Sequence, residues 1–349
     1  LDITPYIKRN YAPLPDRLWA LISHINAIPD VLRVAEEHLR RELALPLLEQ
    51  CLTTFAGIAR FHTAELEGIV RQARDSAILN AFHRANRHAI RAYHDFIARL
   101  RMRLPQATPT LIMGGDSVVA QLAATDLIDK SIDDLLAIGI ADLQRNQADL
   151  ADVAGRLGME PAIALRSLGA QHPPAHALLG ELRLLLADLH RFLQSQDLIT
   201  IPPAGNCLVQ ETLPYMRFGS AFIDAPGPFE AQANEAYLYL TLPDPQWPVD
   251  QREAWLAKQS IPGLANTAMH EAWPGHYLQY LHLAQAPTMA SKVFTCLTFT
   301  EGWAHYAEQI PIEAGYHGDD PYYALQQLSM ALLRDCRCIV ALRLHSGEF

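Results

Sequence analysis

The sequence is poor in positive charge: lysine appears only at Lys8, Lys130, Lys258 and Lys292, and 38 acidic residues outnumber 28 basic ones. The formal net charge is therefore −10 at pH 7. A nucleic-acid-binding protein draws its affinity from a positive surface that neutralises phosphates, so this balance argues against that class of partner. It also offers no attraction to an anionic membrane surface.

Cysteine is scarce as well, and the five residues are odd in number, scattered and without a C-x-x-C pair: Cys51, Cys207, Cys296, Cys336 and Cys338. This pattern predicts neither a disulfide framework nor a thiolate zinc site, and it favours a reduced, cytoplasmic compartment. Because the chain begins at Leu1 rather than Met, a periplasmic or secreted location remains an alternative. No apolar run approaches the roughly 18 to 20 residues of a membrane span, so we expect none.

What the sequence does contain, over its first two hundred residues, is helical periodicity. Apolar residues recur at helical spacing in segments 16–43, 44–73, 77–104, 118–158 and 177–196. The first of these patterns is interrupted at Pro29, which predicts a break there, and Ser131 before two aspartates predicts a helix N-cap.

The composition changes near residue 198, where proline, glycine and β-branched residues become frequent. In segment 235–243 successive side chains alternate between two faces, as in a half-buried strand. The predicted fold class is mainly α, a large helical assembly with a small antiparallel β-sheet next to the helices of the histidine stretch. We expect residues 1–200 to form a helical part that walls a cleft and residues 201–349 to carry the sheet and that stretch. One continuous domain is the alternative.

The stretch His270-Glu-Ala-Trp-Pro-Gly-His276 raises the question of a metal site. Residues i and i+6 of a regular helix point about 120° apart, so an unbroken helix cannot deliver His270 and His276 to one ion. Pro274, however, has no N–H for the carbonyl of His270, and Gly275 adds backbone freedom. A kink at Pro274-Gly275 would bring the two imidazoles together. The bland alternative is a helix with capped or solvated histidines.

A third ligand is available in the segment that follows. Glu301, His305 and Glu308 fall at i, i+4 and i+7 on one predicted helix, and the 25 residues after His276 suffice for a turn and an antiparallel return. Two imidazoles and a carboxylate suit one Zn²⁺ ion with a position left for water. The alternative for Glu301 is an exposed first-turn glutamate beside the positive end of the helix dipole.

Such a site would hydrolyse amide bonds. Zinc lowers the pKa of a bound water to about 7, and Glu271 would accept the proton of that water as it attacks a carbonyl. The predicted strand with Tyr237 and Tyr239 could pair edge to edge with an extended peptide and hold the scissile bond over the metal.

These residues carry a family resemblance. The segments HEAWPGHYLQ and TEGWAHYAE resemble the bacterial family of unknown function numbered 885, whose pattern is H-E-x-x-P-G-H-x-x-Q with a downstream E-G-W segment. The likeness covers most of the chain. The family is regarded as similar to gluzincin-type zinc metallopeptidases, with a helical architecture akin to thimet oligopeptidase.

The resemblance implies roles for individual residues. His270, His276 and Glu301 would be the metal ligands and Glu271 the general base. Gln279 belongs to the motif, and at i+3 from His276 it would be a polar partner that orients this ligand. Glu308 would be a second supporting residue of the site.

Family members usually continue past the point at which this sequence stops, so the C-terminus is expected to be truncated and the donor to the transition state is open. The candidates within the chain are His305, which we assign as a catalytic residue, and Tyr306, Tyr316, Tyr322 and Tyr323. Tyr322 and Tyr323 are also predicted to bind substrate, with core packing as the alternative. Arg334 could grip a substrate carboxylate or take part in a buried ion pair.

The leading hypothesis is a zinc-dependent peptidase that acts on short peptides. A metal-dependent amidohydrolase acting on a small non-peptide amide would use the same site chemistry. A third reading is a non-catalytic helical binding protein whose metal site is vestigial or structural.

Overall fold

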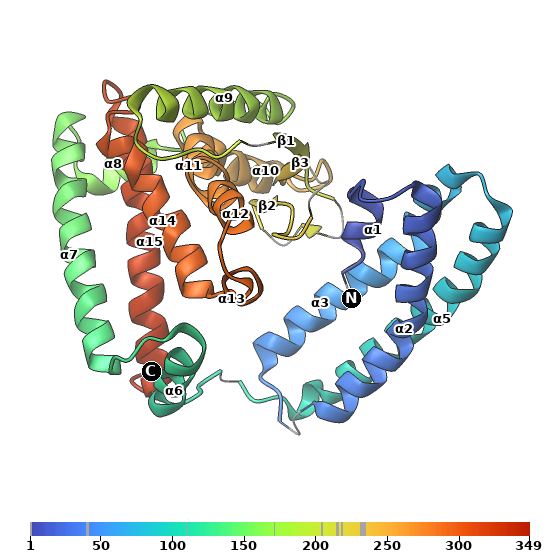
Figure 1. Cartoon of the computed structure of the whole chain (residues 1–349). Helices are drawn as coiled ribbons and strands as arrows, with labels where there is room; N and C mark the ends of the chain where they lie inside the picture. Colours follow the sequence, from blue (N-terminus) through green and yellow to red (C-terminus); the bar gives the residue numbers. More distant parts are fainter. Residues whose placement is uncertain are drawn as a thin grey trace. The chain divides into compact units, whose positions relative to one another are not determined.

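The computed structural model describes residues 2–39, 42–109, 111–170, 172–203, 205–213, 216–217, 219–230 and 235–349. The chain divides into two compact units, Leu1–Leu111 with Leu213–Arg217, and Ile112–Thr212 with Phe218–Phe349. The sequence placed the boundary near residue 200 instead. The helices between 112 and 196 join the second unit because α7 (Ile132–Arg156) packs along α15 (Pro321–Ser346) at the far end of the sequence (Figure 1).

The first unit is entirely helical in its described part. Its α-helices are α1 (Thr4–Lys8), α2 (Leu14–His38), α3 (Leu45–Ala64), α4 (Leu66–Val70) and α5 (Ser76–Arg103), with 3-10 turns at Arg71–Ala73 and Leu104–Gln106. The helices α2 and α5 lie side by side and share one hydrophobic core with α3 and α4.

The break predicted at Pro29 is wrong, because α2 runs through this proline without interruption. Proline inside a helix costs about 3 kcal/mol through its lost hydrogen bond and ring clash. Ile25, Ile28 and Leu32 lie on one face of α2 around it, and all three are buried. Each buried side chain of this size contributes about 1.5–3 kcal/mol, so packing against α5 offsets the cost.

The second unit holds the remaining helices and the sheet. Its helices are α6 (Gly115–Asp126), α7, α8 (Pro161–Ser167), α9 (Leu178–Gln196), α10 (Val249–Leu256), α11 (Ile261–Glu271), α12 (His276–Ala284), α13 (Met289–Val293), α14 (Leu297–Glu313) and α15, with a 3-10 turn at Ala257–Gln259. The N-cap predicted at Ser131 is confirmed. Its hydroxyl accepts from the Asp134 N–H, and the Asp134 carboxylate accepts from the Ser131 N–H, which makes a capping box.

The sheet is mixed rather than antiparallel. Its strands are β1 (Asn206–Glu211), β2 (Ala221–Asp224) and β3 (Glu235–Leu240), in the order β1-β3-β2. β3 pairs in parallel with β1 and antiparallel with β2. The alternation of segment 235–243 identified the strand, but strand direction depends on the connection and is not encoded in that pattern.

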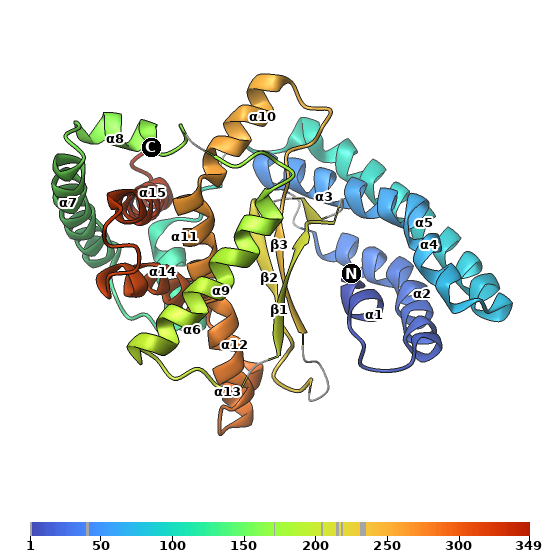
Figure 2. The same cartoon turned by 90° about the horizontal axis from the view of Figure 1, so that it is seen from above.

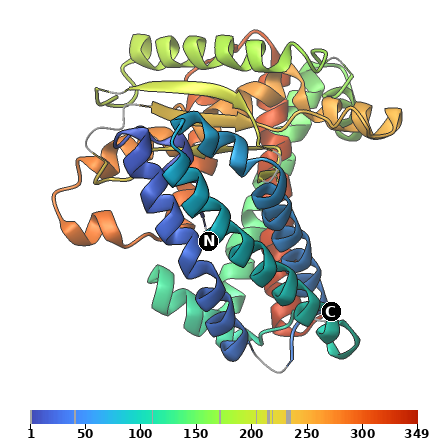
Figure 3. The same cartoon turned by 90° about the vertical axis from the view of Figure 1, so that its right-hand side faces the viewer.

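One hydrophobic core joins the sheet to the helices that carry the histidine stretch. α9 runs along the sheet (Figures 2 and 3), and its leucines share a cluster with Leu238 and Leu240 of β3 and with Leu264, Met269 and Leu278 of α11 and α12. α11 in turn packs on α14 and α15. The sheet and these helices therefore fix the positions from which the site residues project. Among the described helices, none is long and apolar enough to cross a membrane.

Candidate metal centre

The helix carrying the histidine stretch breaks where the sequence predicted. α11 ends at Glu271, α12 begins at His276, and the peptide bond between Trp273 and Pro274 is cis. The N–H groups of Ala272 and Trp273 both turn back to the carbonyl of Ala268, at 2.9 and 3.0 Å, which closes the end of α11. The rings of His270 and His276 now lie 4.9 Å apart, centroid to centroid, at 84° to each other.

Gly275 makes this break possible. A Cβ atom at this position would lie 1.8 Å from the carbonyl oxygen of His270 and 2.4 Å from that of Met269. Real Cβ atoms do not approach backbone oxygens this closely, so any side chain would push α11 and the start of α12 apart. Glycine is required here for close approach of two backbone segments.

The break is also tied to α14. The indole N–H of Trp303 donates to the carbonyl oxygens of Pro274 and Gly275, at 3.0 and 3.3 Å. Trp303 lies two residues after Glu301 in the sequence, so one side chain links the backbone of the break to the helix that carries the third candidate ligand.

α14 is positioned at its start by a residue from α6. Its N-cap, Cys296, supplies no side-chain cap. The carboxylate of Asp126, at the end of α6, caps the helix instead: it accepts from the Thr298 N–H at 3.2 Å and from the Cys296 thiol at 3.2 Å. A carboxylate at a helix N-terminus satisfies otherwise unpaired N–H groups and interacts favourably with the helix dipole.

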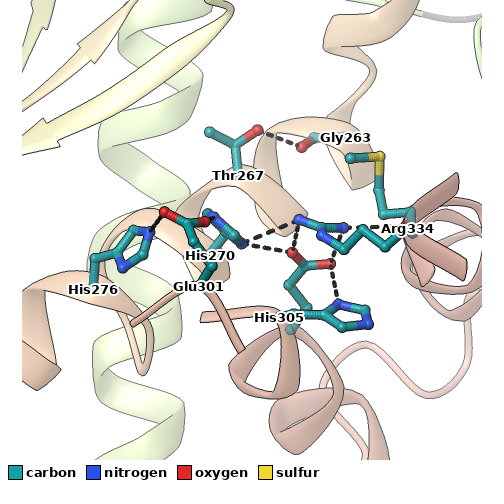
Figure 4. A network of polar contacts seen from close by, with 9 residues as sticks. Gly263, Thr267, His270, His276, Glu301, His305 and Arg334 are labelled. Atoms are coloured by element: carbon teal, nitrogen blue, oxygen red, sulfur yellow. Dashed lines mark hydrogen bonds and ion pairs between the residues drawn. The ribbon is translucent and has the colours of Figure 1, made fainter. Parts of the chain in front are cut away.

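The three predicted ligands converge. His270 Nε2 lies 3.7 Å from Glu301 Oε2, and His276 Nε2 lies 3.8 Å from Glu301 Oε1 (Figure 4). One ligand atom from each residue lies within 4.8 Å of the other two. The imidazoles are nearly buried, whereas the Glu301 side chain is 57% exposed, which leaves access from solvent.

This donor set fits Zn²⁺. Ligand atoms at the usual zinc distances of about 2.0–2.1 Å stand about 3.4 Å from one another in a tetrahedron. The two histidine–glutamate contacts of 3.7 and 3.8 Å are close to that value, so small side-chain adjustments suffice. Two neutral imidazoles and one carboxylate leave a fourth position for a water or a substrate.

The orientation of His270 is set by a buried carboxylate. Glu308, whose side chain is fully buried, lies 2.7 Å from His270 Nδ1. A carboxylate accepts hydrogen bonds, so Nδ1 carries the proton and Nε2 keeps its lone pair for a metal. Arg334 donates to the same Glu308 oxygen at 2.6 Å, and this buried ion pair is the role that the structure gives Arg334.

The charge of Glu308 is stabilised by these partners. Burial alone would raise the pKa of Glu308, but the hydrogen bond from His270, the nearby His305 imidazole and the charge of Arg334 outweigh it and lower the pKa to about 2. The pKa of His270 responds in the opposite sense: burial lowers it, and the hydrogen bond and charge of Glu308 outweigh burial and raise it.

Replacing Glu308 with Ala is expected to destabilise the second unit by about 3–5 kcal/mol, because it leaves the Arg334 guanidinium without its buried partner. Chemical denaturation followed by circular dichroism measures this loss. Glu313→Ala, at an exposed glutamate of the same helix, is the matched control and should change stability by less than about 0.5 kcal/mol. Equal stabilities of the two variants would contradict the assigned ion pair.

Glu271 lies at the end of α11 beside the edge strand β2. The backbone N–H of Ile223 in β2 hydrogen-bonds to its carboxylate, yet burial dominates and raises the pKa of Glu271 to about 7, with the charge of Glu301 acting in the same direction. A carboxylate with a pKa near neutrality can both take up and release a proton under ordinary conditions.

Two predicted supporting residues have specific surroundings. Gln279 donates through Nε2 to the Thr300 hydroxyl at 3.3 Å, while its Oε1 and the Nδ1 of His276, both buried, have no hydrogen-bond partner among the described residues. The proposed Gln279–His276 contact therefore stays a prediction. His305 Nδ1 lies 3.9 Å from Glu308 Oε2, whereas His270 contacts the other oxygen, Oε1. Its catalytic role also stays a prediction.

The edge-pairing role expected for the strand of Tyr237 and Tyr239 is wrong. This strand is β3, which lies between β1 and β2 and has neighbours on both sides. Tyr239 is fully buried and stacks with Phe222, and Tyr237 is 8% exposed and donates to Glu235 at 2.6 Å. The residues of one strand do not reveal whether its edges are occupied, since pairing is decided by distant segments.

Three of the other candidate tyrosines, Tyr316, Tyr322 and Tyr323, have partners other than the three candidate ligands. Tyr322 lies 3.4 Å from the Ser167 hydroxyl, and Tyr323 stacks on His317. Tyr316 is buried and donates to Asp188. Asp320 caps α15 through the Tyr322 N–H, so these residues form a helix start. Substrate binding by Tyr322 and Tyr323 stays a prediction.

Three residues near the site were given no role from the sequence. The indole of Trp303 donates to backbone carbonyls at the break, and the backbone N–H of Ile223 donates to the Glu271 carboxylate. No residue pattern signals such contacts. Tyr280 could have been found, because it lies at i+4 from His276 on the same face of α12. Its half-buried phenol interacts with the charges of Glu301 and Glu271.

The fold and site thus define a mainly helical protein with a small mixed sheet and a candidate His-His-Glu metal centre on a broken helix. The chain belongs to the family described as bacterial protein of unknown function (DUF885), whose match covers residues 2–349. Among curated proteins, no match was found.

Two solved structures share the fold. One is a candidate lipoprotein of unknown function from Shewanella oneidensis, 22% identical, with a TM-score of 0.71 over 98% of this chain and 64% of that one. The other is a candidate lipoprotein from Colwellia psychrerythraea, 15% identical, with a TM-score of 0.76 over 96% of this chain and 61% of that one. The chain therefore spans less than two thirds of the length of either.

Proposed function

We propose that this chain is a zinc-dependent hydrolase that cleaves amide bonds of short peptides. The observation that carries the proposal is the convergence of His270, His276 and Glu301 from two helices, with Glu271 beside them. The motif resemblance to gluzincin-type metallopeptidases supports the same reading, since those enzymes use two histidines and a glutamate with an adjacent glutamate as base.

Each residue then has a task. A zinc ion at the three ligands would polarise the substrate carbonyl and make an attacking water more acidic. Glu271 removes the proton from that water as its oxygen attacks the carbonyl carbon, and it returns the proton to the nitrogen of the departing amine as the C–N bond breaks. Glu308 keeps the His270 ring oriented and selects the neutral tautomer with its proton on Nδ1, so that Nε2 is the atom that would bind the metal.

Substrate would lie along β2 rather than β3. β2 is at the edge of the described sheet, and Ile223 in this strand contacts the general base. An extended peptide next to β2 would place its backbone close to Glu271, which is the arrangement that edge recognition of peptides produces.

Zinc content is the direct test. The purified chain is expected to bind about one Zn²⁺ per molecule, measured by elemental analysis after dialysis, and Glu301→Ala should lose it, because two imidazoles alone bind zinc weakly. Glu313→Ala removes an exposed carboxylate from the same helix and should retain the metal. Protein that stays metal-free in zinc-replete medium, with hydrolysis unaffected by a chelator, would refute the proposal.

The location of the protein is part of the proposal. Both similar structures are named as lipoproteins, so we favour the periplasmic or secreted alternative over the cytoplasmic one. Fractionation of cells that produce the full-length protein, followed by immunoblotting, tests this.

A further inference from the structure

A pocket of about 480 Å³ lies between α12 and the loop that follows β2. From α12 it is lined by Tyr277, Tyr280 and Leu281, which follow the candidate ligand His276 by one, four and five residues. Across from them, Pro228 and Phe229 form the opposite wall. The volume falls within the range of small-ligand sites.

Both walls of this pocket lead back to the candidate metal centre. α12 starts with the ligand His276, and Tyr280 on its pocket face interacts with the charges of Glu301 and Glu271. The opposite wall continues β2, whose Ile223 contacts Glu271. Figure 2 shows α12 next to the end of the sheet from which the loop after β2 emerges. A substrate held along β2 would therefore carry a side chain towards the pocket.

The residues that line the pocket determine which kind of substrate side chain it would accept. The described lining is made of aromatic, aliphatic, proline and glycine residues, and its single charged member is Glu230. The Glu230 carboxylate accepts from the Gly227 N–H at 2.8 Å, and the Tyr277 hydroxyl donates to the Gly205 carbonyl at 3.2 Å, so both take part in local hydrogen bonds. Phe229 is 57% exposed, and an apolar ligand would cover its ring.

We propose that this pocket receives a large apolar or aromatic side chain of the substrate next to the scissile bond. The inference rests on the proposed function, because it names the substrate class of the same site. It assigns Tyr280, Leu281 and Phe229 to specificity, and it makes the preferred substrates short peptides with phenylalanine-like residues.

Filling the pocket tests the inference. Ala284 lines its rim at the exposed end of α12, so Ala284→Phe should fold and occupy the space. Gln285→Phe adds the same side chain at the neighbouring exposed position, which does not line the pocket, and is the matched control. The measurement is kcat/KM of the zinc-loaded protein for paired short peptides that carry phenylalanine or alanine beside the scissile bond.

Wild type and Gln285→Phe are expected to prefer phenylalanine over alanine by about 10-fold or more, the range that apolar pockets achieve. The alanine peptide serves as the reference, because its hydrolysis should change little when the pocket is filled. In Ala284→Phe the preference should fall to near unity. An unchanged preference in Ala284→Phe, or a preference for lysine over phenylalanine, would overturn the inference.

Binding provides a readout that does not need turnover. N-acetyl-L-phenylalanine amide should bind the wild-type chain about 10-fold or more tightly than N-acetyl-L-alanine amide, measured by titration in nuclear magnetic resonance spectra, and Ala284→Phe should abolish the difference. Discrimination without hydrolysis of any peptide would refute the proposed function and leave the pocket assignment standing. Hydrolysis with equal binding of the two amides would refute the pocket assignment alone.

Discussion

Glu271→Gln is expected to lower kcat/KM for peptide hydrolysis by about 10²–10⁴-fold while the protein still binds one zinc ion. The carboxamide keeps the size of the side chain but cannot accept the proton of the attacking water. The three ligand side chains are untouched, so metal binding should persist. Steady-state kinetics and elemental analysis of the same preparation give the two numbers.

Glu313→Gln makes the same chemical change at an exposed position of α14 and should leave both quantities unchanged. A Glu271→Gln protein with full activity would favour the non-catalytic reading or a different base. Loss of zinc together with activity would show instead that Glu271 is itself a metal ligand.

Stability gives a second signature of this variant. Burial raises the pKa of Glu271 to about 7 from the ordinary value of 4.5, so the metal-free folded protein loses stability relative to the unfolded chain as pH rises from about 4.5 to about 7. Glutamine carries no such penalty. The metal-free variant is therefore expected to unfold at a higher temperature than metal-free wild type above pH 7, and at a similar temperature near pH 4.5.

Gly275→Ala is expected to weaken zinc binding by about 100-fold and to destabilise the second unit by about 2–4 kcal/mol. The added Cβ would lie 1.8 Å from the His270 carbonyl oxygen, so α11 and α12 must separate, and His270 and His276 separate with them. Competition with a zinc chelator measures the affinity, and denaturation measures the stability.

Gly302→Ala is the matched control, since a Cβ at Gly302 meets nothing within 4 Å although this glycine adjoins the ligand Glu301. Alanine in a helix is favoured over glycine by about 0.5–1 kcal/mol, so this variant should be slightly more stable and should bind zinc normally. If Gly275→Ala behaved like Gly302→Ala, the close approach at the break would not be what brings the histidines together.

The convergence of the three candidate ligands was predictable from the sequence because it depends on local rules. The i to i+6 spacing of His270 and His276 excludes a shared ion on a regular helix, and Pro274-Gly275 supplies the break that the spacing needs. The helical spacing of Glu301 and Glu308 placed both on one face of the following helix. The break, the second helix and the closeness of the ligands are all present in the structure.

The errors lie where long-range contacts decide. Pro29 interrupts a local pattern, yet packing on α5 keeps α2 continuous. Segment 235–243 reads as a strand, but its place between β1 and β2 depends on residues far along the chain. The partnership of Glu308 with Arg334 joins α14 to α15, and charge alone could not distinguish it from a substrate contact.

The indole of Trp303 has a consequence for how an ion is captured. Because it joins the carbonyls of Pro274 and Gly275 to the helix of Glu301, the protein's own contacts hold the backbone of the histidines against the backbone of Glu301. We therefore expect zinc binding at the proposed site to demand little ordering entropy, unlike binding to a zinc finger, whose chain folds around its metal. The residues proposed to bind zinc would thus be close together before the ion binds.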